Sequence, residues 1–422
     1  MCLQVSKFGM RWQPNPSTIH SLFLITITML HRIQNAHIYD PADRGVCHLL
    51  VAAGRVVYLG SEMPELSQNL LASDTDLEGL RLIPGLVDGH AHTNGGGGEA
   101  GFKTRVPPVP LSDFTRAGVT TVVGLLGTDD LTRGTSALVA RTRALREEGI
   151  SAWCYTGGYH LPLTTLTGSA RSDIVHIDCI LGVGELALSD HRSSQPGTAE
   201  LSRVASEAHV AGLMTGKAGI VHLHLGDGDR GLALVRQVLD KTELPPRVFN
   251  PTHCNRRKAL FEEACELSER GSWIDLTAFP VGPDEDAWSA ADGLQRYLEK
   301  GHPPEQITIS SDGGGCLPEF DHQGQLLKMD YGRLMALPET LAELLAAGLT
   351  LDSILPPLSL NPARLLRLHD KGWLGPGSAA DLVVLDDDHS VRDVMALGVW
   401  HVRAGQVVIR GTFEPVAKER ES

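Results

Sequence analysis

The stretch LIPGLVDGHAH, residues 82–92, begins as a short apolar run and ends with two histidines. Further runs of strand length follow it and alternate with segments in which apolar residues have helical spacing, such as 136–149 and 258–271. The runs are LIPGLVDGHAH (82–92), GVTTVVGLL (118–126), SAWCYTG (151–157), CILGVGELAL (179–188), GIVHLHLGD (219–227), RVFNPTHC (247–254), SWIDLTA (272–278) and QITISSDGG (306–314). A parallel (β/α)8 barrel closes with this number of strands. The sequence therefore predicts an α/β fold with a TIM-type barrel over residues 82–370.

Both ends of the chain have strand patterns of a different kind. Short β-branched runs separated by Gly, Asp and Pro fill residues 23–80, and the segment after the predicted barrel has the same strand pattern. We predict that residues 21–81 and 371–422 build one small β-sandwich domain, preceded by an N-terminal extension over residues 1–20. The apolar stretch Leu22–Leu30 is too short to span a bilayer, and we interpret it as a strand.

Composition narrows the classes of partner. The chain has 422 residues, of which 42% are hydrophobic and 21% charged, which is typical of a globular protein with a large core. Acidic residues exceed basic ones by 51 − 37 = 14, without a run of Lys or Arg. This charge argues against a nucleic-acid or membrane partner and favours a small molecule. Seven cysteines without a C-x-x-C pair indicate a reducing compartment, and we expect the cytoplasm.

Polar residues at the ends of the predicted strands are the candidates for chemistry, because barrel active sites lie at the carboxyl ends of the strands. His90 and His92 are two apart in a strand, so both imidazoles share a face and can reach one ion. His224, His253 and Asp312 occupy matching positions on later runs. Imidazole and carboxylate ligands suit zinc, manganese, iron or cobalt, and an open position on the ion would hold a water that ionises near neutral pH.

Two of these assignments have alternatives. His222 shares its strand face with His224, which we prefer because it lies closer to the end of the run. Asp312 precedes three glycines, so it could instead serve as a turn residue or helix N-cap.

Several motifs together resemble a known family. PGLVDGHAH and GSAADLVVLD are similar to the metal-dependent amidohydrolase superfamily, and GGGGEAG, SDHRS, PTHCNR and SSDGG resemble its isoaspartyl dipeptidases. The resemblance runs from Ile33 to Phe413. It implies a barrel flanked by a β-sandwich, a homo-oligomer, and a pair of zinc ions that hydrolyse the isopeptide bond of β-aspartyl dipeptides.

The resemblance also implies roles for single residues at the metal site. His90, His92 and Asp312 would bind a buried zinc ion. His224 and His253 would bind a more exposed one. Asp312 would in addition act as general base and then general acid, taking a proton from the attacking hydroxide and delivering it to the leaving amine.

A further set of residues would hold the substrate. Tyr159 would polarise the carbonyl, Glu99 would pair with the free ammonium, and both Arg192 and Arg256 would bind carboxylates. The substrate-binding set implied by the resemblance is Gly97, Glu99, Thr128, Tyr159, Arg192, Arg256 and Cys316. A phosphate-binding loop is the rival interpretation of the glycines, but no G-K-[ST] follows them.

The sequence departs from the family at two positions. Glu185 stands where the family has a carboxylated lysine that bridges the metals, and Cys316 stands where it has a substrate-binding serine. We hypothesise that Glu185 bridges two zinc ions. The alternative is a mononuclear site at which Glu185 satisfies a basic neighbour.

The sequence therefore favours a metal-dependent β-aspartyl dipeptidase. The alternatives are another amidohydrolase acting on an N-acyl amino acid or cyclic amide, and a catalytically silent relative. A serine hydrolase is disfavoured because G-x-S-x-G is absent from the chain, and cysteine catalysis would have to use Cys316 or Cys254.

Overall fold

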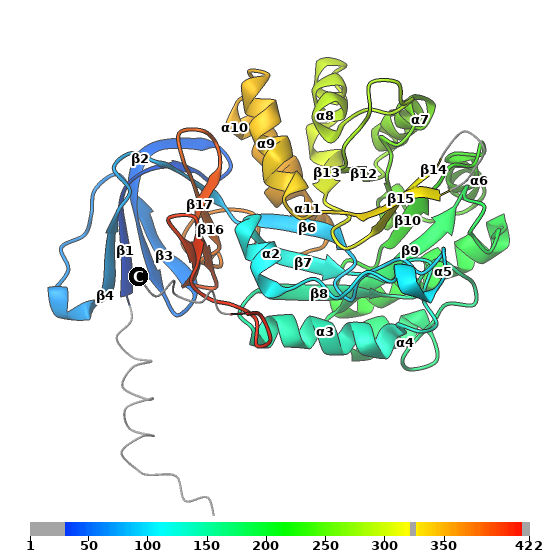
Figure 1. Ribbon diagram of the computed structural model, residues 1–422, viewed down its shortest axis with the longest axis horizontal. Coiled ribbons are helices and arrows are strands. Elements are labelled where there is room, and N and C mark those ends of the chain that lie inside the picture. Colours follow the sequence, from blue (N-terminus) through cyan, green and yellow to red (C-terminus); the bar gives the residue numbers. More distant parts are fainter. Residues whose placement is uncertain (1–29, 321–325, 416–422) are drawn as a thin grey trace, which may run out of the picture.

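The barrel is formed by eight strands that coincide with the eight predicted runs. The computed structural model describes residues 30–320 and 326–415 (Figure 1). The barrel strands are β6 (Leu86–Ala91), β7 (Val119–Gly124), β8 (Ser151–Thr156), β9 (Ile180–Leu188), β10 (Val221–Leu225), β11 (Phe249–Thr252), β12 (Ile274–Thr277) and β13 (Ile307–Ser310). Every residue of β9 is buried, as expected for parallel strands that are covered on both faces.

Backbone hydrogen bonds close the barrel. Strands β6 to β11 pair in chain order in one parallel sheet, and β12 pairs with β13. The backbone N–H of Asp312, just after β13, donates to the carbonyl of His90 on β6 over 3.1 Å. The N–H of Cys254, just after β11, donates to the carbonyl of Asp275 on β12 over 3.1 Å. The predicted TIM-type barrel is confirmed.

Amphipathic helices cover the outside of the barrel. The helices are α2 (Leu111–Arg116), α3 (Thr135–Glu147), α4 (Ala170–His176), α5 (Thr198–Thr215), α6 (Ala233–Lys241), α7 (Lys258–Glu269), α8 (Ala290–Glu299), α9 (Ala336–Ala346), α10 (Leu351–Leu355) and α11 (Asn361–Leu365). Short 3-10 or π turns are η1 (Gln68–Leu70), η2 (Phe102–Thr104), η3 (Pro246–Val248), η4 (Pro304–Gln306) and η5 (Pro356–Leu360). One core cluster joins the strands to these helices, and Phe114, Phe249 and Phe261 are fully buried in it.

A second apolar core lies toward the amino ends of the barrel strands. Val87, Val123, Tyr155 and Leu181 pack together with Leu366, which follows α11. Their apolar side chains exclude water from this end of the barrel, which leaves the carboxyl ends of the strands as the place for polar chemistry.

The two chain ends meet in one sheet beside the barrel (Figure 1). Its strands are β1 (Leu30–Tyr39), β2 (Asp43–Ala52), β3 (Arg55–Gly60), β4 (Leu71–Asp76), β5 (Arg81–Pro84), β16 (Leu382–Leu385), β17 (Val391–Ala396), β18 (Val399–Arg403) and β19 (Gln406–Val407). The antiparallel pairing of β5 with β16 joins the two ends. Ile38, Leu49, Leu382 and Met395 share its core. The β domain made from both ends is thus observed, while its outer boundaries stay predictions.

The structure differs from the sequence prediction in two places. The first predicted run divides at Gly85 into β5 and β6, because β5 pairs within the sheet of the β domain and β6 pairs with β7 in the barrel. A hairpin of β14 (Cys316–Phe320) and β15 (Leu326–Tyr331) follows the barrel and was not predicted. The predicted extension over residues 1–20 and nearly all of Leu22–Leu30 lie outside the described residues. Among the described residues, none of the helices has the length and apolar character that crossing a membrane requires.

Candidate metal centre

All six candidate metal ligands lie at the carboxyl ends of the barrel strands. They come from five strands, and each is at most 6% exposed: His90, His92, Glu185, His224, His253 and Asp312. The alternation of side chains along β6 explains how two histidines of one strand point the same way.

Glu185 is central to this group. Its Oε1 lies 3.4 Å from Nε2 of His92, and its Oε2 lies 3.7 Å from Nε2 of His90. The same Oε2 is 3.1 Å from Nδ1 of His224 and 3.5 Å from Nε2 of His253. One carboxylate therefore faces both proposed pairs of histidines, which is the position that a bridging ligand would need.

Asp312 completes the other side. Its Oδ1 is 3.2 Å from Nε2 of His92 and 3.4 Å from Nε2 of His90. Asp312 and His253 both have a left-handed backbone, with φ of 52° and 59°, which is rare outside glycine and typical of functional sites. The backbone of Asp312 does form a turn, since its carbonyl accepts from Gly315, but its side chain points into the centre.

The donor set fits a metal. Nε2 of His90, Oε1 of Glu185 and Oδ1 of Asp312 are buried without a hydrogen-bond partner, and Nε2 of His92 faces both carboxylates. Buried polar atoms are normally paired, so such a convergence calls for an ion. Three groups among the described residues have ligand atoms within 4.8 Å of one another, and two of them lie here, namely His90 with His92 and Asp312, and His90 with Glu185 and His253. The third group is Asp190 with His191 and Asp227. His224 stands outside all three groups and meets the centre through Glu185.

The electrostatics favour a cation here. Burial opposes ionisation of Glu185 and Asp312, but the surrounding histidines hold the pKa of both carboxyls well below the ordinary range. Burial alone would lower the pKa of His92, yet Asp312 and Glu185 outweigh it and raise that pKa to about 10. The carboxylates thus attract positive charge to this place, whether as a proton or as a metal ion.

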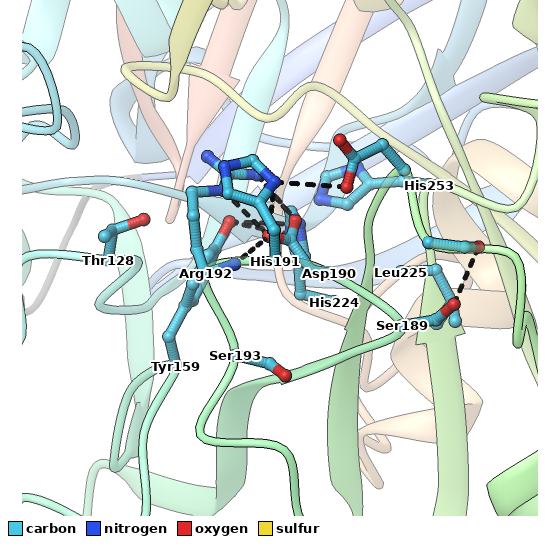
Figure 2. Close-up of polar contacts among 12 residues, drawn as sticks. Thr128, Tyr159, Ser189, Asp190, His191, Arg192, Ser193, His224, Leu225 and His253 are labelled. Carbon is cyan, nitrogen blue, oxygen red and sulfur yellow. Dashed lines mark hydrogen bonds and ion pairs between the residues drawn. The ribbon is translucent and has the colours of Figure 1, made fainter.

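A second polar cluster surrounds His224 (Figure 2). Its Nε2 lies 3.0 Å from Oδ2 of Asp190, which also accepts from Nη2 of Arg192 over 2.8 Å. The Tyr159 hydroxyl is 2.8 Å from Nδ1 of His224. Burial, with Glu185 nearby, raises the pKa of Tyr159 far above its ordinary value. The phenol therefore stays protonated and can donate a hydrogen bond beside the centre.

The candidate substrate-binding side chains also converge. Oε1 of Glu99 accepts from Nη1 of Arg192 and from the Thr128 hydroxyl, each over 3.2 Å. Nη1 of Arg256 donates to a backbone carbonyl of β10 over 3.1 Å and lies 3.5 Å from Nε2 of His224. A carboxylate and two guanidinium groups thus border the metal centre on one side.

Gly97 and Cys316 lie against each other at the rim. Gly97 has φ of 79°, and a side chain there would meet the Thr104 carbonyl at 2.4 Å and the Cys316 sulfur at 3.5 Å. Burial and nearby carboxylates raise the pKa of Cys316 to about 12, and burial raises that of Cys254 as well. Both thiols stay protonated, which disfavours cysteine catalysis because the thiolate is the nucleophile.

Supporting residues were not predicted. Asp88 is fully buried and accepts from the backbone N–H groups of His90 and Ser311, each over 3.2 Å. Burial raises the pKa of Asp88 to about 6. Asp190 was overlooked although it belongs to the quoted SDHRS motif. Its position two residues before Arg192 is a signal, and Asp88 has a similar one because it stands two residues before His90 on the same strand face.

Comparison with known proteins identifies the class. The amidohydrolase family matches residues 81–408, so the chain belongs to the amidohydrolase family, and it is an enzyme of the hydrolase type. The structure of a β-aspartyl dipeptidase from Fervidobacterium islandicum AW-1 in complex with β-Asp-Leu is similar, with a TM-score of 0.83. It is 38% identical in sequence, and the match covers 93% of this chain and 100% of that chain. The resemblance to isoaspartyl dipeptidases is thereby confirmed.

Other relatives have other names. Adenine deaminase of Deinococcus deserti is 25% identical over 373 residues, which is 84% of this chain. This chain spans only 56% of the length of that deaminase. Imidazolonepropionase of Paracoccus denitrificans is 25% identical over 391 residues, covering 83% of this chain and 90% of its own length. The family thus includes proteins with several named activities.

Removal of metal should destabilise the protein. A divalent ion that binds only the folded chain adds about 2.7 kcal/mol to the free energy of unfolding when its concentration is 100 times the dissociation constant. We therefore expect a chelator to lower the thermal unfolding midpoint and zinc to restore it, as measured by differential scanning calorimetry. Equal midpoints for chelated and zinc-loaded protein would contradict a metal centre at these residues.

Proposed function

We propose that this hydrolase cleaves the isopeptide bond of β-aspartyl dipeptides with two zinc ions held by the six residues of the metal centre. One observation carries the substrate assignment. Glu99, Arg192 and Arg256 place one negative and two positive side chains beside the centre. A β-aspartyl dipeptide carries the complementary set, namely one ammonium and two carboxylates. The similar structure from Fervidobacterium islandicum was solved with such a dipeptide.

The side chains of the pocket would orient the substrate. Glu99 would release Arg192 and bind the substrate ammonium. The charge-assisted hydrogen bond to the ammonium would replace its hydrogen bond with Arg192. Arg192 and Arg256 would each offer a carboxylate two parallel donors. Arg192 is held for this task by Asp190, which binds both its Nε and Nη2.

The reaction would then depend on Asp312 and Tyr159. The zinc pair, when bound, would polarise the amide carbonyl and activate a water molecule. Asp312 would hold the proton released by that water and transfer it to the nitrogen of the leaving amine. Tyr159 would donate its hydroxyl proton in a hydrogen bond to the oxygen on which negative charge develops. Its raised pKa keeps that donor intact.

Glu185 would replace a longer bridging group. The contacts of its two oxygens with four histidines support a bridge between the two ion positions. The mononuclear alternative requires Glu185 to satisfy a single basic neighbour, which the described contacts do not favour.

A second candidate function is hydrolysis of an N-acyl amino acid or a cyclic amide by the same centre. The name of the imidazolonepropionase relative, which refers to a cyclic amide, is the observation in favour of the cyclic amide. A neutral cyclic amide would leave Glu99, Arg192 and Arg256 without a role. Cytoplasmic location and a homo-oligomeric state stay predictions, supported for the former by six described cysteines that are all unpaired.

The decisive experiment compares β-Asp-Leu with α-Asp-Leu as substrates of the zinc-loaded protein, with dihydrouracil as a cyclic amide. We expect turnover of β-Asp-Leu alone, because the α-linked isomer moves the ammonium away from Glu99 when the scissile bond is at the centre. Release of leucine, followed by chromatography, measures it. Cleavage of dihydrouracil without cleavage of β-Asp-Leu would transfer the assignment to the second candidate.

Loss of the Asp312 carboxylate should stop proton transfer. We expect Asp312→Asn to lower kcat for β-Asp-Leu by at least about a hundredfold, the usual range for a general base. The control is Asp240→Asn, an exposed carboxylate that contacts Arg270 outside the site and should keep wild-type kcat. Circular dichroism would verify that both variants fold. Wild-type kcat in folded Asp312→Asn would refute the assignment.

Metal counting should test the bridge. We expect two zinc ions per chain in saturated wild-type protein and no more than one in Glu185→Ala, since both sites lose a ligand. Inductively coupled plasma mass spectrometry after removal of free zinc gives the count. Glu262→Ala removes an exposed carboxylate from α7 and serves as control. A saturated wild-type count of one would show that Glu185 does not bridge two ions.

A further inference from the structure

His222 lies beneath the metal centre and connects it to the next strand. Its ring stacks on Tyr155, with centroids 5.3 Å apart and an interplanar angle of 16°, so its nitrogens have fixed directions. Nε2 of His222 lies 2.8 Å from Nδ1 of His90, and Nδ1 of His222 lies 2.7 Å from Oδ1 of Asn250. His222 and Asn250 are direct partners across β10 and β11. All of these side chains are at most 2% exposed.

Asn250, at the far end of this chain of hydrogen bonds, determines which ring nitrogen of each histidine carries a proton. The side-chain nitrogen of Asn250 donates to the backbone carbonyl of Trp273 over 3.4 Å, so the amide oxygen faces His222. An amide oxygen only accepts, and therefore Nδ1 of His222 carries a proton. A neutral imidazole has one protonated nitrogen, so Nε2 of His222 has a lone pair, and it faces Nδ1 of His90 over 2.8 Å. His90 must then donate from its Nδ1.

This arrangement decides which nitrogen of His90 meets a metal. Its Nε2 has no hydrogen-bond partner and lies 3.4 Å from Oδ1 of Asp312. We propose that Asn250 and His222 are positioning residues, which keep the Nδ1 proton on His90 and so reserve its Nε2 for the metal. The role at the metal rests on the proposed function, in which His90 is a ligand, whereas the proton arrangement does not.

The contacts of His222 also argue against it as a metal ligand in place of His224. Both of its nitrogens are engaged, one by His90 and one by Asn250, so neither is free for an ion. None of the three candidate ligand groups among the described residues includes it. Outer partners of this kind orient a metal-binding histidine and typically change metal affinity by 10- to 100-fold when removed.

The first test measures zinc affinity by competition with a chelating dye. We expect His222→Leu to weaken binding by about 10- to 100-fold, because His90 loses its acceptor. His222→Gln should stay close to wild type, because its amide oxygen can accept from His90 while its nitrogen donates to Asn250. The zinc affinity of Asn250→Leu should fall between those of His222→Leu and His222→Gln. The control is Asn361→Leu, which removes a buried amide bonded to the carbonyls of Pro304 and Ile307, away from the site.

The second test needs no metal. In metal-free protein with 15N-labelled histidine, nuclear magnetic resonance should show a proton on Nδ1 of both His90 and His222, and an unprotonated Nε2 on His222. Asn250→Leu should abolish the fixed proton position on His222. A proton on Nε2 of His222 in the wild type would overturn the proposal. Equal zinc affinity for His222→Leu and His222→Gln would also overturn it, since packing alone would then explain the effect. If wild-type protein binds no zinc, the proposed function fails, and the resonance result alone decides the proton arrangement.

Discussion

Two buried carboxylates, Glu185 and Asp312, are the constraint on which the rest of the site depends. An unpaired carboxylate in a barrel interior is costly, because it loses its hydration without compensation. Imidazoles from other strands surround both carboxylates and offset this loss of hydration. Other buried polar groups of the barrel, such as Asp88 and Asp275, are instead satisfied by hydrogen bonds from neighbouring strands. Burial and charge together make a cation the natural occupant.

Much of this architecture could be predicted from the sequence because burial leaves a clear pattern. A parallel strand that is covered on both faces, such as β9, is a continuous apolar run and therefore easy to recognise. Polar residues that interrupt or end such runs stand out, so five of the six candidate ligands can be recognised from the sequence pattern. The chain ends were recognisable because alternating strands and turns look different from barrel segments.

The remaining features depend on contacts that the sequence does not display. Gly85 separates two strands because β5 and β6 pair in different sheets, and those pairings are not visible in the sequence. The hairpin after Cys316 follows a glycine-rich segment that has no strand pattern of its own. Asn250 resembles any polar residue of a strand until its partners are known, and these belong to neighbouring strands. The bridging role of Glu185 and the roles of the substrate-binding residues follow only from resemblance to a family, whereas the strand-end pattern itself indicates the candidate histidine ligands and Asp312.

The seam between β13 and β6 has a consequence for how the site comes into being. There the backbone of Asp312 binds that of His90, so the first and last barrel strands carry adjacent parts of one centre. Contacts between residues so distant in the chain form late, since a long loop must close before they are gained. A nascent chain would thus lack its ion-binding centre until the final strand has been synthesised. Metal capture would then mark the completion of folding.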